Sequence, residues 1–197
     1  MAHEHDWDAE YAAPTPPPWD IGEAQPALVA FLDRTPIDDP VLDVGCGTGE
    51  LALLLAGRGH QVIGVDGSAP AIEHATAKAT TRGVDVDFQV GDALHLTDLG
   101  VRPRTVIDCG LLHVLDEQER DAYVTQLAEI CGPGALVAVL AVSAEADEGW
   151  DLTEASLREW FLSPHWVSCA VGTIEVRAHW QGADLRLPGF LLTCRRG

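Results

Sequence analysis

Basic residues are scarce in this chain. Its 197 residues include 12 Lys and Arg against 31 Asp and Glu, which gives a formal net charge of −19 at pH 7. Proteins that bind nucleic acids draw most of their sequence-independent affinity from Lys and Arg, and an acidic surface repels phosphate groups. We therefore expect neither a nucleic acid nor an anionic membrane as partner.

Long apolar runs and paired cysteines are also missing. Apolar stretches such as 135–142 are far shorter than the ~20 residues that cross a bilayer, and the N-terminus lacks the basic and apolar regions of a secretory signal. The cysteines are odd in number, lie far apart and form no C-x-x-C pair, which predicts a reducing, cytoplasmic environment with no disulfide framework and no metal site. They are Cys46, Cys109, Cys131, Cys169 and Cys194.

The first 19 residues differ in composition from the rest. They are polar and end in a proline-rich run before Trp19, with too few apolar residues to form a core element. We expect a mobile arm over 1–19 and a single domain over 20–197, because a chain that is 47% hydrophobic at this length can bury one sizeable core.

From residue 41 onward, short apolar runs alternate with helical patterns. Buried strands separated by helices of about 10–15 residues indicate β-α-β units, so we predict an α/β, Rossmann-like doubly wound sheet that is mostly parallel. The expected strands are 41–44, 61–65, 84–90, 105–109 and 135–142, and the expected helices are 49–58, 70–82 and 117–131.

The last quarter of the chain has a different pattern. A helix is expected at 153–162, followed by two strand-like runs at 165–180 and 189–194 with a turn-rich link between them. Two strands with a short link must be antiparallel, because a parallel return needs a long crossover. An antiparallel C-terminal hairpin should therefore close the sheet.

The strongest functional signal is an apolar run that leads into a glycine-rich turn. Its sequence is Val41-Leu-Asp-Val-Gly-Cys-Gly-Thr-Gly-Glu50. A buried strand that runs into three glycines brings bare backbone to the carboxyl end of the sheet, where open α/β sheets bind ligands. Asp66 follows the next strand at about the 20-residue separation at which a carboxylate holds ribose hydroxyls.

The spacing of this turn argues against a dinucleotide. The pattern is G-x-G-x-G-E rather than G-x-G-x-x-G, and Glu50 at the helix start would repel a phosphate. A ligand with a cationic or zwitterionic tail suits the turn better, which leaves an NAD-dependent oxidoreductase as the weaker alternative.

The segment resembles the first motif of class I S-adenosylmethionine-dependent methyltransferases, E/D-x-G-x-G-x-G, and the resemblance extends from about residue 19 to residue 194. It implies S-adenosylmethionine as cofactor, with Asp43 near its ammonium group, Asp66 on the ribose, and Asp92 and Ala93 at the adenine. The implied cofactor-binding set is Trp19, Asp43, Gly45, Cys46, Gly47, Gly49, Asp66, Gly67, Asp92, Ala93, Cys109 and Gly110.

A narrower resemblance rests on Pro18-Trp-Asp-Ile-Gly-Glu-Ala-Gln-Pro26 and on Asp108-Cys-Gly-Leu-Leu-His-Val-Leu. Both segments are similar to the thiopurine, thiol and halide methyltransferase group and to bacterial relatives that methylate small heterocycles. The resemblance implies that Trp19 is a lid over the cofactor, whereas the residues alone are equally consistent with a packing tryptophan.

An acceptor pocket is expected beyond the fourth strand. His113 could take a proton from the acceptor or could be a structural histidine, while Cys46 and Cys109 are interpreted as inert thiols because no cation lies near them in sequence. The expected pocket walls are Trp19, Leu111, Leu112, His113 and Trp150.

These observations predict an enzyme that transfers a methyl group by in-line displacement to S, N or O of a small aromatic, heterocyclic or thiol acceptor, or to a halide. A cofactor-binding sensor without transfer activity uses the same fold and remains the alternative from another class. The oligomeric state is left open by the sequence.

Overall fold

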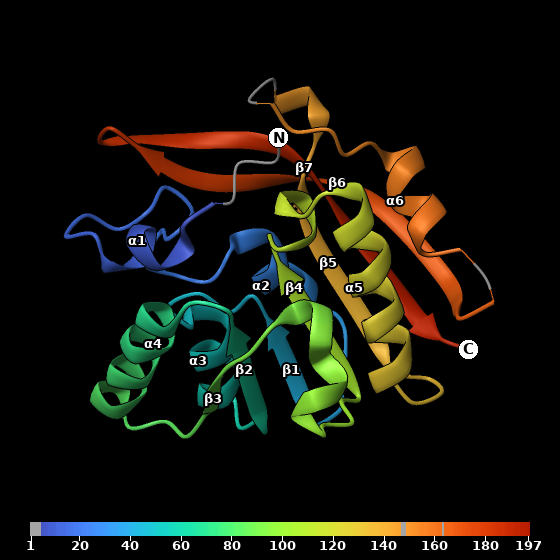
Figure 1. Cartoon of the computed structure of the whole chain (residues 1–197), viewed down its shortest axis with the longest axis horizontal. Coiled ribbons are helices and arrows are strands. Elements are labelled where there is room, and N and C mark those ends of the chain that lie inside the picture. Colours follow the sequence, from blue (N-terminus) through green and yellow to red (C-terminus); the bar gives the residue numbers. More distant parts are fainter. Residues whose placement is uncertain (1–4, 147–148, 163) are drawn as a thin grey trace.

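The computed structural model describes residues 5–146, 149–162 and 164–197 (Figure 1). Its centre is one seven-stranded sheet in the order β3-β2-β1-β4-β5-β7-β6, in which the first five strands are parallel. The predicted fold class is confirmed. The strands are β1 (Val41–Val44), β2 (Val62–Asp66), β3 (Asp87–Val90), β4 (Thr105–Cys109), β5 (Leu136–Val142), β6 (Trp166–Trp180) and β7 (Ala183–Arg196).

Helices cover both faces of this sheet. The side chains of α2 and α3 pack with β1 and β2 in one apolar cluster, whereas those of α5 and α6 pack in a larger cluster on the other face. The α-helices are α1 (Trp7–Ala12), α2 (Pro26–Leu32), α3 (Glu50–Gly57), α4 (Ala69–Arg82), α5 (Glu117–Ile130) and α6 (Glu154–Trp160). The connections that the structure describes also contain the 3-10 helices η1 (Ala93–Leu99), η2 (Leu112–Val114) and η3 (Ala144–Ala146).

Local sequence explains where the longer helices begin. Asp116 and Glu119 form a reciprocal capping box at the start of α5, and Ser68 caps α4 ahead of Pro70. The central strand β5 is buried along its whole length, as expected for a strand with helices on both sides. Within the described ranges, no helix is both long and apolar enough to cross a membrane.

The C-terminal hairpin closes the sheet as predicted. Its first strand begins one residue later than the expected 165–180, and its second strand is longer than the expected 189–194. Gln181 and Gly182 have φ of 51° and 81°, the backbone of a two-residue turn that suits the twist of paired strands. β7 inserts antiparallel between β5 and β6, so β6 is the edge strand. In Figure 1 the free end of the hairpin extends toward α1.

The prediction that residues 1–19 contain no core element is wrong for α1. Asp6 caps this short helix by accepting a hydrogen bond from the backbone of Ala9, and Tyr11 is buried. A six-residue helix is not stable by propensity alone, and packing of α1 against α4 explains its presence. The segment before Trp19 thus supplies a buried side chain that its composition did not indicate.

Candidate functional site

The glycine turn lies where the strand order of the sheet reverses, between β1 and β4. Gly45, Gly47 and Gly49 have φ of 67°, 53° and 84°, a region that disfavours any other side chain. A Cβ on Gly45 would lie 2.9 Å from Leu111 Cβ, and a Cβ on Gly49 would lie 2.7 Å from the Phe88 ring. The turn therefore needs glycine both for its backbone conformation and for close packing at this edge.

Asp66 at the end of β2 is tied to the same turn. One carboxylate oxygen accepts a hydrogen bond of 2.8 Å from the Gly47 N–H, and the other accepts one of 2.9 Å from the Ser68 N–H. Burial nevertheless raises the pKa of Asp66. Each oxygen keeps a lone pair for a further donor, such as a hydroxyl group of a ligand.

Asp43 is the most unusual polar group at the site. Its side chain is completely buried on β1, and neither carboxylate oxygen has a hydrogen-bond partner among the described residues. Burial, and then the nearby carboxylate of Asp108, raise the pKa of Asp43 to about 8. A buried carboxyl group without a partner is costly, so this position favours a ligand that brings a positive charge or a donor.

Asp108 on β4 shows how a neighbouring carboxylate is satisfied. It accepts hydrogen bonds from the backbone N–H groups of Gly110, Leu111 and Leu112 at 3.0, 2.7 and 3.1 Å. Burial still raises the pKa of Asp108 to about 7. These three bonds shape the turn after β4, so Asp108 has a structural role that Asp43 lacks.

The far end of the site is more open. Asp92 follows β3, is exposed, and caps η1 by accepting 2.8 Å hydrogen bonds from Leu94 N–H and from the ring of His95. Ala93 begins η1, and Gly67 faces Gly91 across the gap between the ends of β2 and β3. The structure therefore brings Asp92, Ala93 and Gly67 to the same edge as Asp66.

The two cysteines of the site are half-buried free thiols. Burial raises the pKa of Cys46 and of Cys109 well above the usual range, and the neighbouring carboxylate of Asp43 raises both further. Both groups are therefore protonated at neutral pH and poorly suited to nucleophilic or metal chemistry. Among the described residues, no group of three or more His, Cys, Asp or Glu could hold a metal ion.

Aromatic residues of the N-terminal segment cover the glycine turn. The Tyr11 hydroxyl lies 2.9 Å from the position that a Cβ on Gly47 would take, and it accepts a 2.9 Å hydrogen bond from the indole N–H of Trp19. The rings of Trp19 and Trp7 meet edge to face with their centroids 5.6 Å apart, and Trp19 is 40% exposed. Tyr11 was missed from the sequence, although its spacing of four residues from Trp7 is helical.

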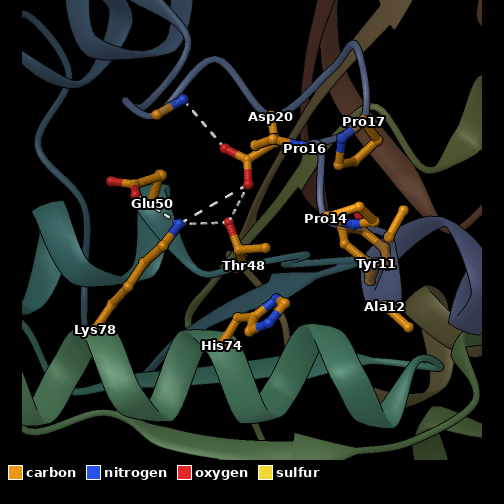
Figure 2. A pocket seen from close by; sticks show the side chains of 12 residues that line it. Tyr11, Ala12, Pro14, Pro16, Pro17, Asp20, Thr48, Glu50, His74 and Lys78 are labelled. Carbon is orange, nitrogen blue, oxygen red and sulfur yellow. Dashed lines mark hydrogen bonds and ion pairs between the residues drawn. The ribbon is translucent and has the colours of Figure 1, made fainter.

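A polar network fastens this segment to the glycine turn (Figure 2). The Thr48 hydroxyl donates a 2.7 Å hydrogen bond to Asp20, and Lys78 on α4 donates to Thr48 at 2.6 Å and to Glu50 at 2.8 Å. Arg82 pairs with Glu50 at 2.8 Å. Lys78 is the only lysine in the sequence, and its Nζ lies 3.8 Å from the Asp20 carboxylate, a contact that the sequence pattern does not indicate.

The same segment is also anchored to the hairpin. The side-chain amide of Gln25 donates to the Arg177 carbonyl at 2.7 Å and accepts from the Arg177 N–H at 2.9 Å, so it pairs with the edge of β6. The His179 N–H donates to the Pro18 carbonyl at 2.8 Å. The cover over the glycine turn is therefore held from two sides, by α4 and by the hairpin.

The expected acceptor pocket is only partly assembled as predicted. Leu111 lies against Gly45, and the rings of His113 and Trp150 meet edge to face at 4.5 Å. Leu112, however, is completely buried in the core cluster with Tyr123, because the tight η2 turn directs successive side chains to different sides. Leu112 therefore packs in the core, and its expected place on the pocket wall is not what the structure shows.

His113 is a neutral histidine in this structure. Burial, and then the Arg120 guanidinium, lower its pKa to about 4. The Val142 N–H donates a 3.4 Å hydrogen bond to Nδ1, which leaves the ring proton on Nε2. Trp150 Nε1 is buried beside this ring with no hydrogen-bond partner in the described part of the chain.

Known proteins resemble this chain over most of its length. The family model of a methyltransferase domain matches residues 41–135. The chain is 33% identical over 172 residues to a 2-heptyl-1-hydroxyquinolin-4(1H)-one methyltransferase of Mycobacteroides abscessus, an alignment that covers 84% of this chain and 75% of that protein. It is 31% identical over 151 residues to a ubiquinone biosynthesis O-methyltransferase of Brucella ovis, an alignment that covers 74% of this chain and 59% of that protein.

Solved structures show the same fold. One, from work on the conversion of a disulfide bond into a thioacetal group during echinomycin biosynthesis, is 38% identical, has a TM-score of 0.83, and covers 91% of this chain and 85% of its own. Magnesium protoporphyrin IX methyltransferase from Synechocystis PCC 6803 with bound SAM is 23% identical, with a TM-score of 0.63 and coverage of 87% and 75%.

Because the carboxyl group of Asp43 is buried, we predict that Asp43→Asn raises the free energy of unfolding by an amount that depends on pH. Because the pKa of Asp43 is raised to about 8 in the folded chain, the unfolded chain loses this proton at a lower pH, and the free energy of unfolding falls as pH rises from about 4 to about 8. Asn cannot ionise, so the variant should gain stability relative to wild type between pH 5.5 and 8.5, on the order of a few kcal/mol.

Urea denaturation at the two pH values measures this difference. Asp85→Asn, which changes an exposed carboxylate, is the matched control. Its free energy of unfolding should differ from that of wild type by the same small amount at both pH values. A stability difference between Asp43→Asn and wild type that does not grow with pH would contradict the assignment.

Proposed function

The chain belongs to the S-adenosylmethionine-dependent methyltransferases, and we propose that it transfers the methyl group to S, N or O of a small acceptor or to a halide. Membership rests on the match to the hydroxyquinolone methyltransferase, which covers 84% of this chain at 33% identity. It is therefore an enzyme with S-adenosylmethionine as cofactor. The sensor and NAD-dependent alternatives are not favoured by these relatives.

The observation that carries the cofactor assignment is the buried, unpartnered carboxyl group of Asp43 beside the glycine turn. We propose that Asp43 accepts from the cofactor's ammonium group, whose charge would favour the ionised carboxylate. The backbone of Gly45, Gly47 and Gly49 would lie along the methionine moiety, because bare backbone there leaves room for a ligand. The fit is chemical, since a zwitterionic amino acid offers a cation where the site has an unsatisfied acid.

The remaining cofactor contacts follow the edge of the sheet. Asp66 would accept from the ribose hydroxyls with the lone pairs that the Gly47 and Ser68 N–H groups leave free. The remaining proposed contacts lie at the two ends of the cofactor, adenine and methionine. These residues are Cys46, Gly67, Asp92, Ala93, Cys109 and Gly110.

The protein's part in the reaction is mainly to position the acceptor. When bound, S-adenosylmethionine supplies a methyl group on a sulfonium, which is already activated for in-line displacement. The acceptor then needs to be held at about 3–3.5 Å from the methyl carbon, with water excluded. Leu111, His113 and Trp150 would offer apolar and aromatic surfaces for this task beside the end of β4.

His113 supports positioning better than proton removal. Its ring proton lies on Nε2, since Nδ1 accepts from the Val142 N–H, and among the described residues no group accepts from Nε2. Acting as a base through Nε2 would require a change of tautomer and the loss of the bond to Val142. We therefore propose that His113 donates a hydrogen bond to the acceptor, with a base role as the alternative.

The class of acceptor is the least defined part of the proposal. The relatives act on a hydroxyquinolone and in the conversion of a disulfide to a thioacetal, so heteroaromatic hydroxyls and sulfur are the first groups to test. The narrower resemblance to the thiopurine, thiol and halide group is not confirmed by these relatives and remains a prediction. The five free cysteines support a reducing, cytoplasmic location as a further proposal.

A turnover assay tests the proposed function. Purified protein with S-adenosylmethionine should form S-adenosylhomocysteine with at least one member of a panel of N-hydroxyquinolones, phenols, thiols, N-heterocycles and iodide. Calorimetry on the same sample should show binding of the cofactor and none of NAD. Cofactor binding without turnover across the whole panel would contradict a small acceptor.

The ribose contact predicts that Asp66→Ala weakens cofactor binding. Loss of hydrogen bonds to a charged group costs ~1.5–3 kcal/mol, which corresponds to a roughly 10- to 100-fold higher Kd. Calorimetry measures the change, and the exposed Asp87→Ala on β3 is the control that should leave the Kd unaltered. Unchanged affinity in folded Asp66→Ala would mean that the ribose is held elsewhere.

The aromatic cover predicts a selective effect of Trp19→Ala. If Trp19 is a lid beside the sulfonium, it contributes a cation–π interaction of ~0.5–2 kcal/mol, and its loss lowers turnover by roughly 3- to 30-fold. The melting temperature should fall by only a few degrees, because Trp19 is partly exposed. Trp180→Ala, at the exposed end of the hairpin, is the control. A loss of stability without a loss of turnover would identify Trp19 as a packing residue.

A further inference from the structure

Arg120 is a buried cation outside the cofactor site. Its side chain projects from α5, is 5% exposed, and donates to the carbonyls of Leu112 and His113 at 3.2 and 3.3 Å. It also binds both carboxylate oxygens of Asp151, at 3.0 and 2.7 Å. The ring of Trp160 lies 5.2 Å from the guanidinium carbon. All of these partners are distant from the glycine turn in sequence.

Stability alone is a weak explanation for such a group. Removing a guanidinium from water is costly, and apolar side chains of similar volume commonly stabilise a protein as well or better. The contact between Arg120 and Asp151 does, however, fix the orientation of the carboxylate. A planar guanidinium that binds one carboxylate through two N–H groups holds it in a single orientation. The side chain of Asp151 is 68% exposed, and Arg120 is its hydrogen-bond partner among the described residues, so this bridge fixes the carboxylate.

The two segments that Arg120 joins carry the two aromatic rings of the expected acceptor pocket. Its bond to the His113 carbonyl holds η2, and its bonds to Asp151 hold the segment directly after Trp150. The rings of His113 and Trp150 meet at 4.5 Å with an interplanar angle of 90°. No hydrogen bond within the described residues holds the Trp150 indole in place, so the bridge at the next residue is its nearest polar anchor.

We propose that Arg120 is a positioning residue for the acceptor site: by joining η2 to Asp151, it sets the spacing and angle of the His113 and Trp150 rings. The inference rests on the proposed function, because it takes these rings as walls of the acceptor pocket. The proposal also distinguishes the acceptor site of the enzyme from its cofactor site. Most of the proposed cofactor contacts lie at the ends of β1, β2 and β3, which Arg120 does not contact among its described hydrogen bonds. Cys109 and Gly110 lie closer to it, because they precede the η2 turn that Arg120 holds.

Arg120→Met and Asp151→Asn test this assignment. Each should raise the acceptor KM or lower kcat by about tenfold or more, while the Kd of S-adenosylmethionine stays within about twofold of wild type. The double variant should be little worse than Arg120→Met, because the two residues act through one bridge. Arg158→Met, which removes an exposed ion pair with Glu154 on α6, is the matched control and should change none of these values.

A second readout does not depend on turnover. The indole N–H resonance of Trp150, assigned through Trp150→Phe, should shift in Arg120→Met and Asp151→Asn but not in Arg158→Met. Arg120→Lys keeps the positive charge but lacks the two N–H groups that bind the Asp151 carboxylate together, so it should shift the Trp150 resonance as well. If Arg120→Met does not fold, Asp151→Asn carries the test, since it alters only a largely exposed side chain.

The outcomes separate the two proposals. Unchanged acceptor kinetics and an unmoved Trp150 resonance in folded variants would overturn the positioning role, as would an equal loss of cofactor affinity, which indicates general loosening. If the wild-type enzyme methylates no small acceptor, the proposed function fails. The Trp150 resonance then decides by itself whether Arg120 holds this ring.

Discussion

The burial of carboxylates at the carboxyl edge of a parallel sheet is the constraint on which the rest of this structure depends. Asp43, Asp66 and Asp108 are all buried there, and only Asp66 and Asp108 are satisfied by backbone N–H groups of the described chain. An unsatisfied buried acid is costly, and the ammonium group proposed to bind Asp43 would supply the positive charge that this position lacks. The glycine turn is tightly packed as well, since a Cβ on Gly45, Gly47 or Gly49 would lie 2.9, 2.9 or 2.7 Å from Leu111, Tyr11 or Phe88.

Enclosure of this edge comes from parts of the chain that are far apart in sequence. The N-terminal segment reaches the glycine turn through Asp20 and Lys78, and it reaches the hairpin through Gln25. An ion pair between two exposed side chains contributes little, but here Thr48, Glu50 and Lys78 form a connected, partly buried network. The cover is thus attached to the glycine turn itself.

The predictable part of the structure is the part encoded locally. The strands at 41–44 and 105–109 occur with the predicted bounds, because buried parallel strands are continuous apolar runs ended by glycine or a polar turn. The helix α1 was missed, because six residues carry too little periodicity and Tyr11 is buried by tertiary contacts, among them those with Gly47 and Trp19. The insertion of β7 between β5 and β6 is likewise a matter of tertiary pairing, which strand patterns do not specify.

The same distinction explains why the sequence indicates the cofactor more clearly than the acceptor. The acidic and glycine residues proposed for the cofactor lie within a few residues of strand ends, and their spacing along the chain follows from the sheet. The acceptor side is assembled by contacts across 29 residues, between His113 and Val142, and across 31, between Arg120 and Asp151. If these residues line the acceptor pocket as proposed, substitutions in the 149–153 segment would alter the pocket and leave the ends of β1 and β2 unchanged. A fold built in this way would keep one cofactor while its acceptors diverge.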